Sequence, residues 1–253
     1  MLAQEPLELT YTGNMGVLIH DQKTAILIDG LHKEYQAAYL FPPPALTNQL
    51  INGQKGIPAI SLLLNTHFHR DHFDEALSAQ FLQKNPTASF IGSQQAVDLI
   101  GEASDQLQQR LIAIPYEDYQ KRQFAFTGFS VKAFKMDHVN PTRHHAVQNL
   151  GFIINIDGLK ILHIGDSHWY EDIQLFEKVK MMDENIDVAI LPYWMLLSEK
   201  DKEQLNQYIH PEYLIATHIP PDLSEADAKA IWRIFPNAIL FQALGQTLHV
   251  ERG

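Results

Sequence analysis

The sequence has no cysteine, and its positive charges are few. Without thiols, disulfide bonds, cysteine-ligated zinc and a cysteine nucleophile are excluded, so any metal site must use histidine, aspartate and glutamate. Lysine and arginine number 19 against 30 aspartates and glutamates, which gives a formal net charge of -11. This acidic field repels phosphate backbones, and we therefore expect a small-molecule substrate rather than nucleic acid.

Long apolar runs are missing as well. No run approaches the length that spans a bilayer, and the first residues form neither a basic nor an apolar leader, so we expect no membrane span. The cytoplasm is the expected compartment, although a secreted protein whose signal peptide had been removed would look the same. With 253 residues and 45% hydrophobic content, the chain is expected to fold as one domain over residues 1–253. Nothing in the sequence indicates its oligomeric state.

Histidine, in contrast, is abundant: the 13 histidines suggest metal binding or acid-base chemistry. Short strands alternate with helices, which predicts a mixed α/β fold that begins with a β-meander. Capping boxes at Ser198 and Ser224 predict two late helices, and the proline-rich residues 42–56 are expected to form a long loop. The predicted strands cover residues 7–11, 17–20, 25–29, 60–65, 88–91, 122–127, 129–136, 151–156, 159–164, 188–191, 213–217 and 238–241.

Residues 14–30 are echoed by residues 149–166. Each segment contains Asn-x-Gly, an apolar strand, a turn, a second strand and an acidic residue at its end. This similarity indicates a duplicated chain with two alike halves. The alternative is that two β-hairpins resemble each other by chance.

The clearest chemical signal is the run Thr-His-Phe-His-Arg-Asp-His that ends at His72. In extended backbone, residues two apart point the same way, so His67 and His69 can bind one metal ion. Asp71 and His72 follow where the chain turns towards a helix predicted over residues 74–84, and they can bind a second metal ion. The alternative is a chance cluster of surface histidines, which the spacing and the preceding apolar strand disfavour.

This run resembles the HxHxDH signature of the metallo-β-lactamase superfamily, and the resemblance covers nearly the whole chain. It implies an α/β fold made of a four-layer αβ/βα sandwich, in which two mixed β-sheets pack together. Asp29 resembles the family's first acidic motif and would support the metal-binding loop from behind. Asp166 would bridge two metal ions, and His218, at the end of a late strand, would complete the second site.

The remaining ligand lies among three histidines at residues 138–145. We choose His138 because it directly follows the strand over residues 129–136, with His145 as the alternative. The resemblance makes Asp71 and Asp166 the catalytic carboxylates. A second set of residues is expected in the substrate pocket, unless they are ordinary surface or core residues: His32, His145, His168 and Trp194.

The resemblance implies two divalent metal ions that share a hydroxide, which would attack an ester, lactone or phosphodiester of a small molecule. Zinc suits the nitrogen-rich ligands best, and manganese or iron are also accepted. The sequence is closest to the group of ascorbate-phosphate lactonase-like and N-acyl-phosphatidylethanolamine phospholipase-like enzymes. The alternatives are a metal-containing binding protein without activity and a mono-iron redox member of the same fold.

Overall fold

The computed structural model describes residues 6–53, 55–117 and 119–251. The chain divides into two compact units, each built on one seven-stranded mixed sheet. The first unit extends to residue 113 and takes up the chain again from residue 243, and the second unit contains residues 114–242.

The sheet of the first unit has the strand order β14-β1-β2-β3-β4-β5-β6. Strands β1 to β3 pair antiparallel, which confirms the predicted meander, and β3, β4 and β5 are parallel. The sequence did not predict β6 or β14. The strands are β1 (Leu7–Gly13), β2 (Gly16–His20), β3 (Ala25–Ile28), β4 (Leu62–Leu64), β5 (Ser89–Ser93), β6 (Leu111–Ile114) and β14 (Thr247–Val250).

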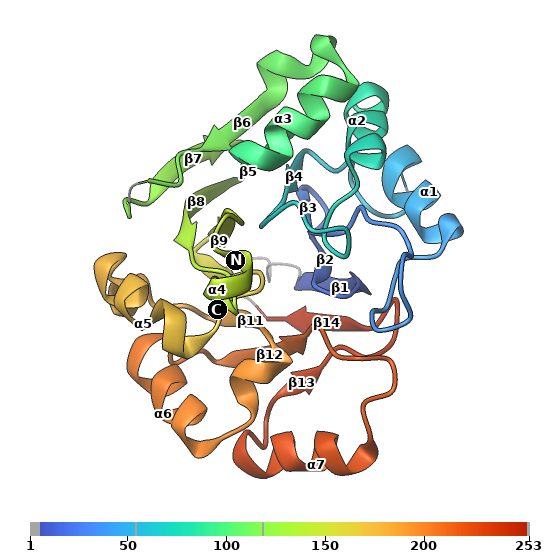
Figure 1. The fold of residues 1–253 in the computed structure, drawn as a ribbon. Coiled ribbons are helices and arrows are strands. Elements are labelled where there is room, and N and C mark those ends of the chain that lie inside the picture. The colour runs from blue at the N-terminus through green and yellow to red at the C-terminus, as the bar shows by residue number, and fades with distance from the viewer. Residues whose placement is uncertain (1–5, 54, 118, 252–253) are drawn as a thin grey trace, which may run out of the picture. The chain divides into compact units, whose positions relative to one another are not determined.

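Helices α1 (Pro44–Asn52), α2 (Glu75–Lys84) and α3 (Gln94–Ala103) lie beside this sheet, followed by the 3-10 helix η1 (Asp105–Arg110) (Figure 1). Their apolar side chains share one core with Leu27 and Leu63 of the sheet. The alternate residues Ile26 and Leu62 are also fully buried. Because both faces are buried, β3 and β4 are apolar throughout, as parallel strands usually are.

The loop predicted over residues 42–56 is wrong in its middle, where α1 lies. Pro44 occupies the first helical position, where a missing N–H leaves no hydrogen bond unmade. Thr47, Leu50 and Ile51 then bury one face of the helix. A run of prolines usually indicates a loop. Here the last of the three prolines begins a helix, and the sequence pattern did not predict that helix.

The second unit has the strand order β13-β12-β11-β10-β9-β8-β7. Strands β8 to β10 pair antiparallel, and β10 to β13 are parallel. The succession of β1 to β5 is thus repeated in β8 to β12, which supports the predicted duplication. The strands are β7 (Arg122–Phe126), β8 (Phe129–Met136), β9 (Asn149–Ile156), β10 (Leu159–His163), β11 (Val188–Pro192), β12 (Tyr213–Thr217) and β13 (Ile239–Leu240).

Three longer helices pack on this second sheet through a single apolar core: α5 (Trp169–Lys178), α6 (Glu199–Tyr208) and α7 (Glu225–Ile234). Shorter turns are α4 (Pro141–His144), η2 (Met181–Glu184) and η3 (Tyr193–Leu196). Both predicted capping boxes are confirmed, because Ser198 accepts from the Asp201 N–H at 3.2 Å and Ser224 from the Asp227 N–H at 3.1 Å.

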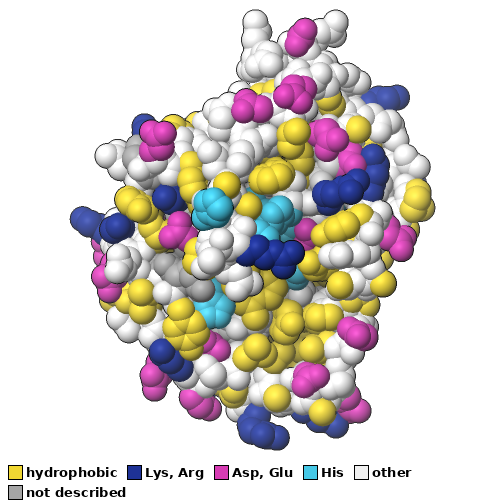
Figure 2. Space-filling model, viewed as in Figure 1, with side chains coloured by type: hydrophobic (Ala, Val, Ile, Leu, Met, Phe, Trp, Pro, Cys, Tyr) yellow, Lys and Arg dark blue, Asp and Glu magenta, His cyan; other side chains and the backbone are white. Residues whose placement is uncertain are grey.

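Among the described residues, no helix has the length and apolar character needed to cross a bilayer. Acidic and basic side chains are scattered over the face shown in Figure 2 rather than gathered in one patch.

A buried carboxylate joins three parts of the second unit. Glu184 in η2 is 4% exposed and forms ion pairs with Lys121 and with Lys132 of β8. Its backbone carbonyl also accepts a hydrogen bond from Lys160 of β10. Burial acts to raise the pKa of Glu184, but the hydrogen bonds from the two lysines outweigh it, and the pKa is lowered below 4.5.

We expect Glu184→Gln to lower the free energy of unfolding by about 1–3 kcal/mol at neutral pH, because it leaves two lysines without their anion. A carboxyl group whose pKa is lowered by folding contributes stability above its ordinary pKa and loses it as the pH falls through the folded value. The difference between wild type and variant should therefore vanish in acid. Urea denaturation as a function of pH measures it, with the exposed Glu102→Gln in α3 as control. A difference that persists below the folded pKa would contradict this account.

Candidate metal centre

Asp29, directly after β3, holds the histidine loop that follows β4. Its Oδ1 accepts from the Thr66 N–H at 2.8 Å and from the Asn65 amide at 3.2 Å. Its Oδ2 accepts from the Thr66 hydroxyl at 2.6 Å and pairs with His72 Nδ1 at 2.9 Å. Asp29 itself has a φ of 45°, a left-handed conformation that is costly for aspartate and typical of functional sites. These contacts are those of the supporting role predicted for Asp29.

The same hydrogen bonds determine where two histidines carry their protons. A carboxylate only accepts, so the Thr66 hydroxyl donates its single hydrogen to Asp29 and must accept from His67 Nδ1, 3.0 Å away. His72 Nδ1 must likewise donate to Asp29. In the neutral imidazoles of His67 and His72, Nε2 is then the unprotonated nitrogen, which is the form that binds a metal ion.

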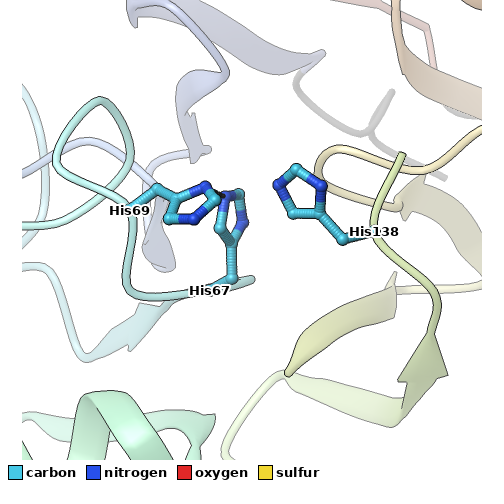
Figure 3. Close-up of side chains that lie close together, drawn as sticks. All are labelled: His67, His69 and His138. Carbon is cyan, nitrogen blue, oxygen red and sulfur yellow. Dashed lines mark hydrogen bonds between the residues drawn. The ribbon is translucent and has the colours of Figure 1, made fainter. Parts of the chain in front are cut away.

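His67 and His69 present neighbouring ring nitrogens, as Figure 3 shows on the loop after β4. His67 Nε2 lies 3.1 Å from His69 Nδ1, and the two rings are inclined by 79°. Nitrogens this close on rings that face different ways can share one cation. That His67 and His69 bind the same metal ion stays a prediction, and the structure places their ring nitrogens close enough for it.

Asp71 is held on both of its carboxylate oxygens. The Asn14 amide donates to Asp71 Oδ2 and to the Asp71 carbonyl, both at 3.0 Å, and the Tyr35 hydroxyl donates to Oδ1 at 3.3 Å. Asp71 Oδ2 lies 3.5 Å from His72 Nε2, and both residues are buried. Asn14 and Tyr35 were not predicted as site residues. The repeated Asn-x-Gly was a signal for Asn14, but no sequence pattern marked Tyr35.

In the second unit, two imidazoles face one carboxylate oxygen. Asp166 Oδ2 lies 3.6 Å from His138 Nε2 and 3.5 Å from His218 Nε2, and all three side chains are buried. His138 Nδ1 must donate to the Val139 carbonyl at 2.7 Å, because a carbonyl only accepts. A neutral His138 thus turns an unprotonated Nε2 towards a carboxylate, an arrangement that a metal cation between them would stabilise. These three residues therefore fit the predicted metal-ligand set.

The position of His218 is fixed by backbone and by an aromatic neighbour. It directly follows β12 with a φ of 56°. The Trp194 ring packs edge-on against it at 4.7 Å, and the Trp194 indole N–H donates to the Ser167 carbonyl at 2.9 Å. Trp194, predicted to line the pocket, therefore packs against a proposed ligand and connects it to the turn that carries Asp166.

His138 and His145, the two alternatives for one ligand, differ in their surroundings. His138, drawn in Figure 3, is 5% exposed and lies beside Asp166, whereas His145 is exposed at the end of α4. This arrangement favours His138. His144 packs its ring on His138 at 4.5 Å, and burial, followed by the charge of Arg143, lowers the pKa of His144.

His168 and His32, both expected in the pocket, have defined structural contacts. His168 caps α5, where its Nδ1 accepts from the Tyr170 N–H at 3.1 Å. His32 is fully buried and contacts the Gly13 carbonyl at 3.3 Å. Burial, with a further contribution from His72, lowers the pKa of His32 to about 4, so it is neutral at physiological pH.

The chain is similar in sequence to a known protein family and to a known metal-dependent hydrolase. The family model described as "Beta-lactamase superfamily domain" matches residues 8–218. A UPF0173 metal-dependent hydrolase of Symbiobacterium thermophilum is 25% identical over 84% of both chains.

Two solved structures have the same fold. A possible metal-dependent hydrolase from Veillonella parvula is 14% identical, with a TM-score of 0.69 over 98% of this chain and 100% of the other. A metallo hydrolase from Ignicoccus hospitalis is 17% identical, with a TM-score of 0.63 over the same shares. The predicted α/β class and metallo-β-lactamase fold are confirmed, and the chain belongs to the β-lactamase superfamily domain family.

Proposed function

We propose that this chain is a hydrolase that uses two divalent metal ions. At the level of a metal-dependent hydrolase, the prediction agrees with the names of its relatives. The family model extends from residue 8 to residue 218 and so includes every proposed ligand. These ligands are His67, His69, Asp71, His72, His138, Asp166 and His218.

The observation that carries this proposal is the carboxylate of Asp166 with an imidazole nitrogen on either side. The proposed ligand set consists of five imidazoles and two carboxylates. This nitrogen-rich set suits zinc, and it also accepts manganese or iron. When bound, two such ions lower the pKa of water and stabilise the charge that develops on the attacked and leaving oxygens.

The side chains of the protein have separate tasks in this scheme. Asp29 and Thr66 keep the ligand nitrogens of His67 and His72 unprotonated, so the loop is ready to bind metal without rearrangement. Asn14 and Tyr35 orient Asp71. We propose that the bond cleaved is an ester, lactone or phosphodiester, and that the substrate is a small molecule, because the net charge of -11 disfavours nucleic acid.

The test is to count metal ions per chain by elemental analysis of the purified protein before and after loading with zinc, and to assay lactones, carboxylic esters, β-lactams and chromogenic phosphodiesters. We expect two ions per chain and turnover of one acyl or phosphodiester class. One iron per chain would instead support the redox alternative. Two ions without turnover of any substrate would support a metal-containing binding protein.

His138→Ala should lose one metal ion and most of the activity, because it removes a ligand that faces Asp166. His145→Ala should keep both ions and change KM for the substrate by more than it changes metal content, since His145 is exposed beside α4. Elemental analysis and steady-state kinetics on both variants measure this. The reverse outcome would exchange the roles of the two residues.

A further inference from the structure

A pocket of about 440 Å³ lies in the first unit, between the segment that follows β3 and helices α1 and α2. This volume is within the range of pockets that bind small molecules. Its wall includes Phe41, the three prolines at residues 42–44, and Leu77 of α2. Proline has no backbone N–H, so three in succession leave this part of the wall without backbone donors.

Most polar groups that line the pocket are engaged or exposed, and the exception is Nδ1 of the buried His32, which has no hydrogen-bond partner among the described residues. The Thr47 hydroxyl donates to the Pro43 carbonyl at 3.4 Å. Lys33 Nζ pairs with Asp74 Oδ2 at 2.9 Å. Lys33 and Glu34 both line the pocket, and both are exposed. An occupant would therefore meet a mainly apolar wall with one imidazole nitrogen, and charged side chains where the pocket opens.

The pocket is joined directly to the proposed metal-binding loop. Leu31 forms a β-bridge with Phe73, and its carbonyl accepts from the Asp74 N–H at 2.8 Å. The ring of Phe41, in the pocket wall, packs edge-on against the ring of Tyr35 with 5.7 Å between the ring centroids. The Tyr35 hydroxyl donates a hydrogen bond to Asp71. The pocket wall is thus one aromatic side chain away from Asp71.

We propose that this pocket binds an alkyl chain of the substrate, which makes the substrate an amphiphile with its cleavable bond next to the chain. The proposal rests on the proposed function for its catalytic part only. Proline fixes the backbone φ angle, so this part of the wall loses little conformational entropy when a chain enters.

Asn48 offers a way to close the pocket without touching the core. It lines the pocket from an exposed position on α1, and the neighbouring Gln49 is equally exposed but does not line it. Asn48→Trp should place an indole in the pocket, and Gln49→Trp is the matched control. Both variants should keep the thermal stability and metal content of the wild type.

Calorimetric titration of the metal-free protein with octanamide and acetamide tests binding independently of turnover. We expect octanamide to bind at least tenfold more tightly than acetamide, and Asn48→Trp, but not Gln49→Trp, to lose this preference. Equal binding of the two amides, or unchanged octanamide binding by Asn48→Trp, would overturn the proposal.

The catalytic part is measured with p-nitrophenyl acetate and octanoate on the zinc-loaded protein. We expect kcat/KM to be at least tenfold higher for octanoate, with the difference abolished in Asn48→Trp and kept in Gln49→Trp. Turnover without chain-length preference would overturn the pocket proposal and leave the hydrolase intact. Octanamide binding with no ester, lactone or phosphodiester cleaved would support the pocket and count against the proposed function.

Discussion

Asp166→Asn should abolish turnover and reduce the metal content below two ions per chain. The substitution removes the negative charge that faces His138 and His218, at 3.6 and 3.5 Å. Loss of residues that merely support metal ligands costs 10–100-fold in affinity or activity, so we expect loss of a bridging ligand to lower kcat/KM by more than about 100-fold. Steady-state kinetics and elemental analysis measure both effects.

The amide also changes what the metal-free protein prefers. Asparagine can donate a hydrogen bond to the unprotonated Nε2 of His138, so the site becomes satisfied without a cation. Metal-free Asp166→Asn should therefore be at least as stable as the metal-free wild type, and added zinc should raise the Tm of the wild type by more than that of the variant. A general loss of folding would lower the stability of both forms instead.

Asp201→Asn is the matched control, since Asp201 is also a buried aspartate. It accepts from the Leu197 N–H at 3.1 Å and from the Ser198 hydroxyl at 2.8 Å at the start of α6. We expect it to lose about 1 kcal/mol of stability as a helix-cap change while metal content and kcat/KM stay at wild-type values. Full activity in Asp166→Asn would show that the site assignment is wrong.

The parts of the site that sequence predicts are those whose signal is local. His67, His69, Asp71 and His72 follow one strand within six residues, and their spacing alone indicates their common purpose. The same holds for the capping box at Ser198, where cap and partner are three residues apart. Such short-range patterns are decided by backbone geometry near each residue, which is written in the neighbouring sequence.

Contacts between distant segments were predicted only where the family resemblance supplied them. Asp29 is 37 residues before Thr66, and its role was assigned by resemblance rather than by pattern. Tyr35 reaches Asp71 from a segment with no regular period, and nothing in the sequence near Tyr35 marks that contact. Trp194 was expected to touch substrate, but its packing on His218 depends on how β11 and β12 pair.

The fold shows the same division. The strands with strong apolar patterns were predicted within a few residues, whereas β14 was missed because it is defined by antiparallel pairing with β1 across almost the whole chain. Gly16 explains one of the repeated letters, since a Cβ there would come within 2.8 Å of the Asp29 carbonyl oxygen. The glycine of Asn-x-Gly in the first unit is thus required by this close approach, and the sequence alone did not predict that approach.

Asp29→Asn should reduce zinc affinity by about 10–100-fold, the range found for residues that orient metal ligands. Asp29 Oδ2 accepts from both the Thr66 hydroxyl and His72 Nδ1. If an amide NH2 replaces Oδ2, it is itself a donor and lies against two other donors, the Thr66 hydroxyl and His72 Nδ1. The strain is relieved if His72 moves its proton from Nδ1 to Nε2, but Nε2 is the atom that must bind the metal ion.

Two measurements separate this mechanism from simple loss of stability. Competition with a chelator gives the zinc affinity, and nitrogen-15 chemical shifts of the metal-free protein show which His72 nitrogen is protonated. We expect Nδ1–H in the wild type and a shift towards Nε2–H in Asp29→Asn. Asp21→Asn is the control, because Asp21 Oδ1 also accepts two backbone N–H groups, from Lys23 and Thr24 at 2.7 Å, but contacts no histidine of the loop. Wild-type zinc affinity in Asp29→Asn would mean that the loop holds its ligand tautomers without Asp29.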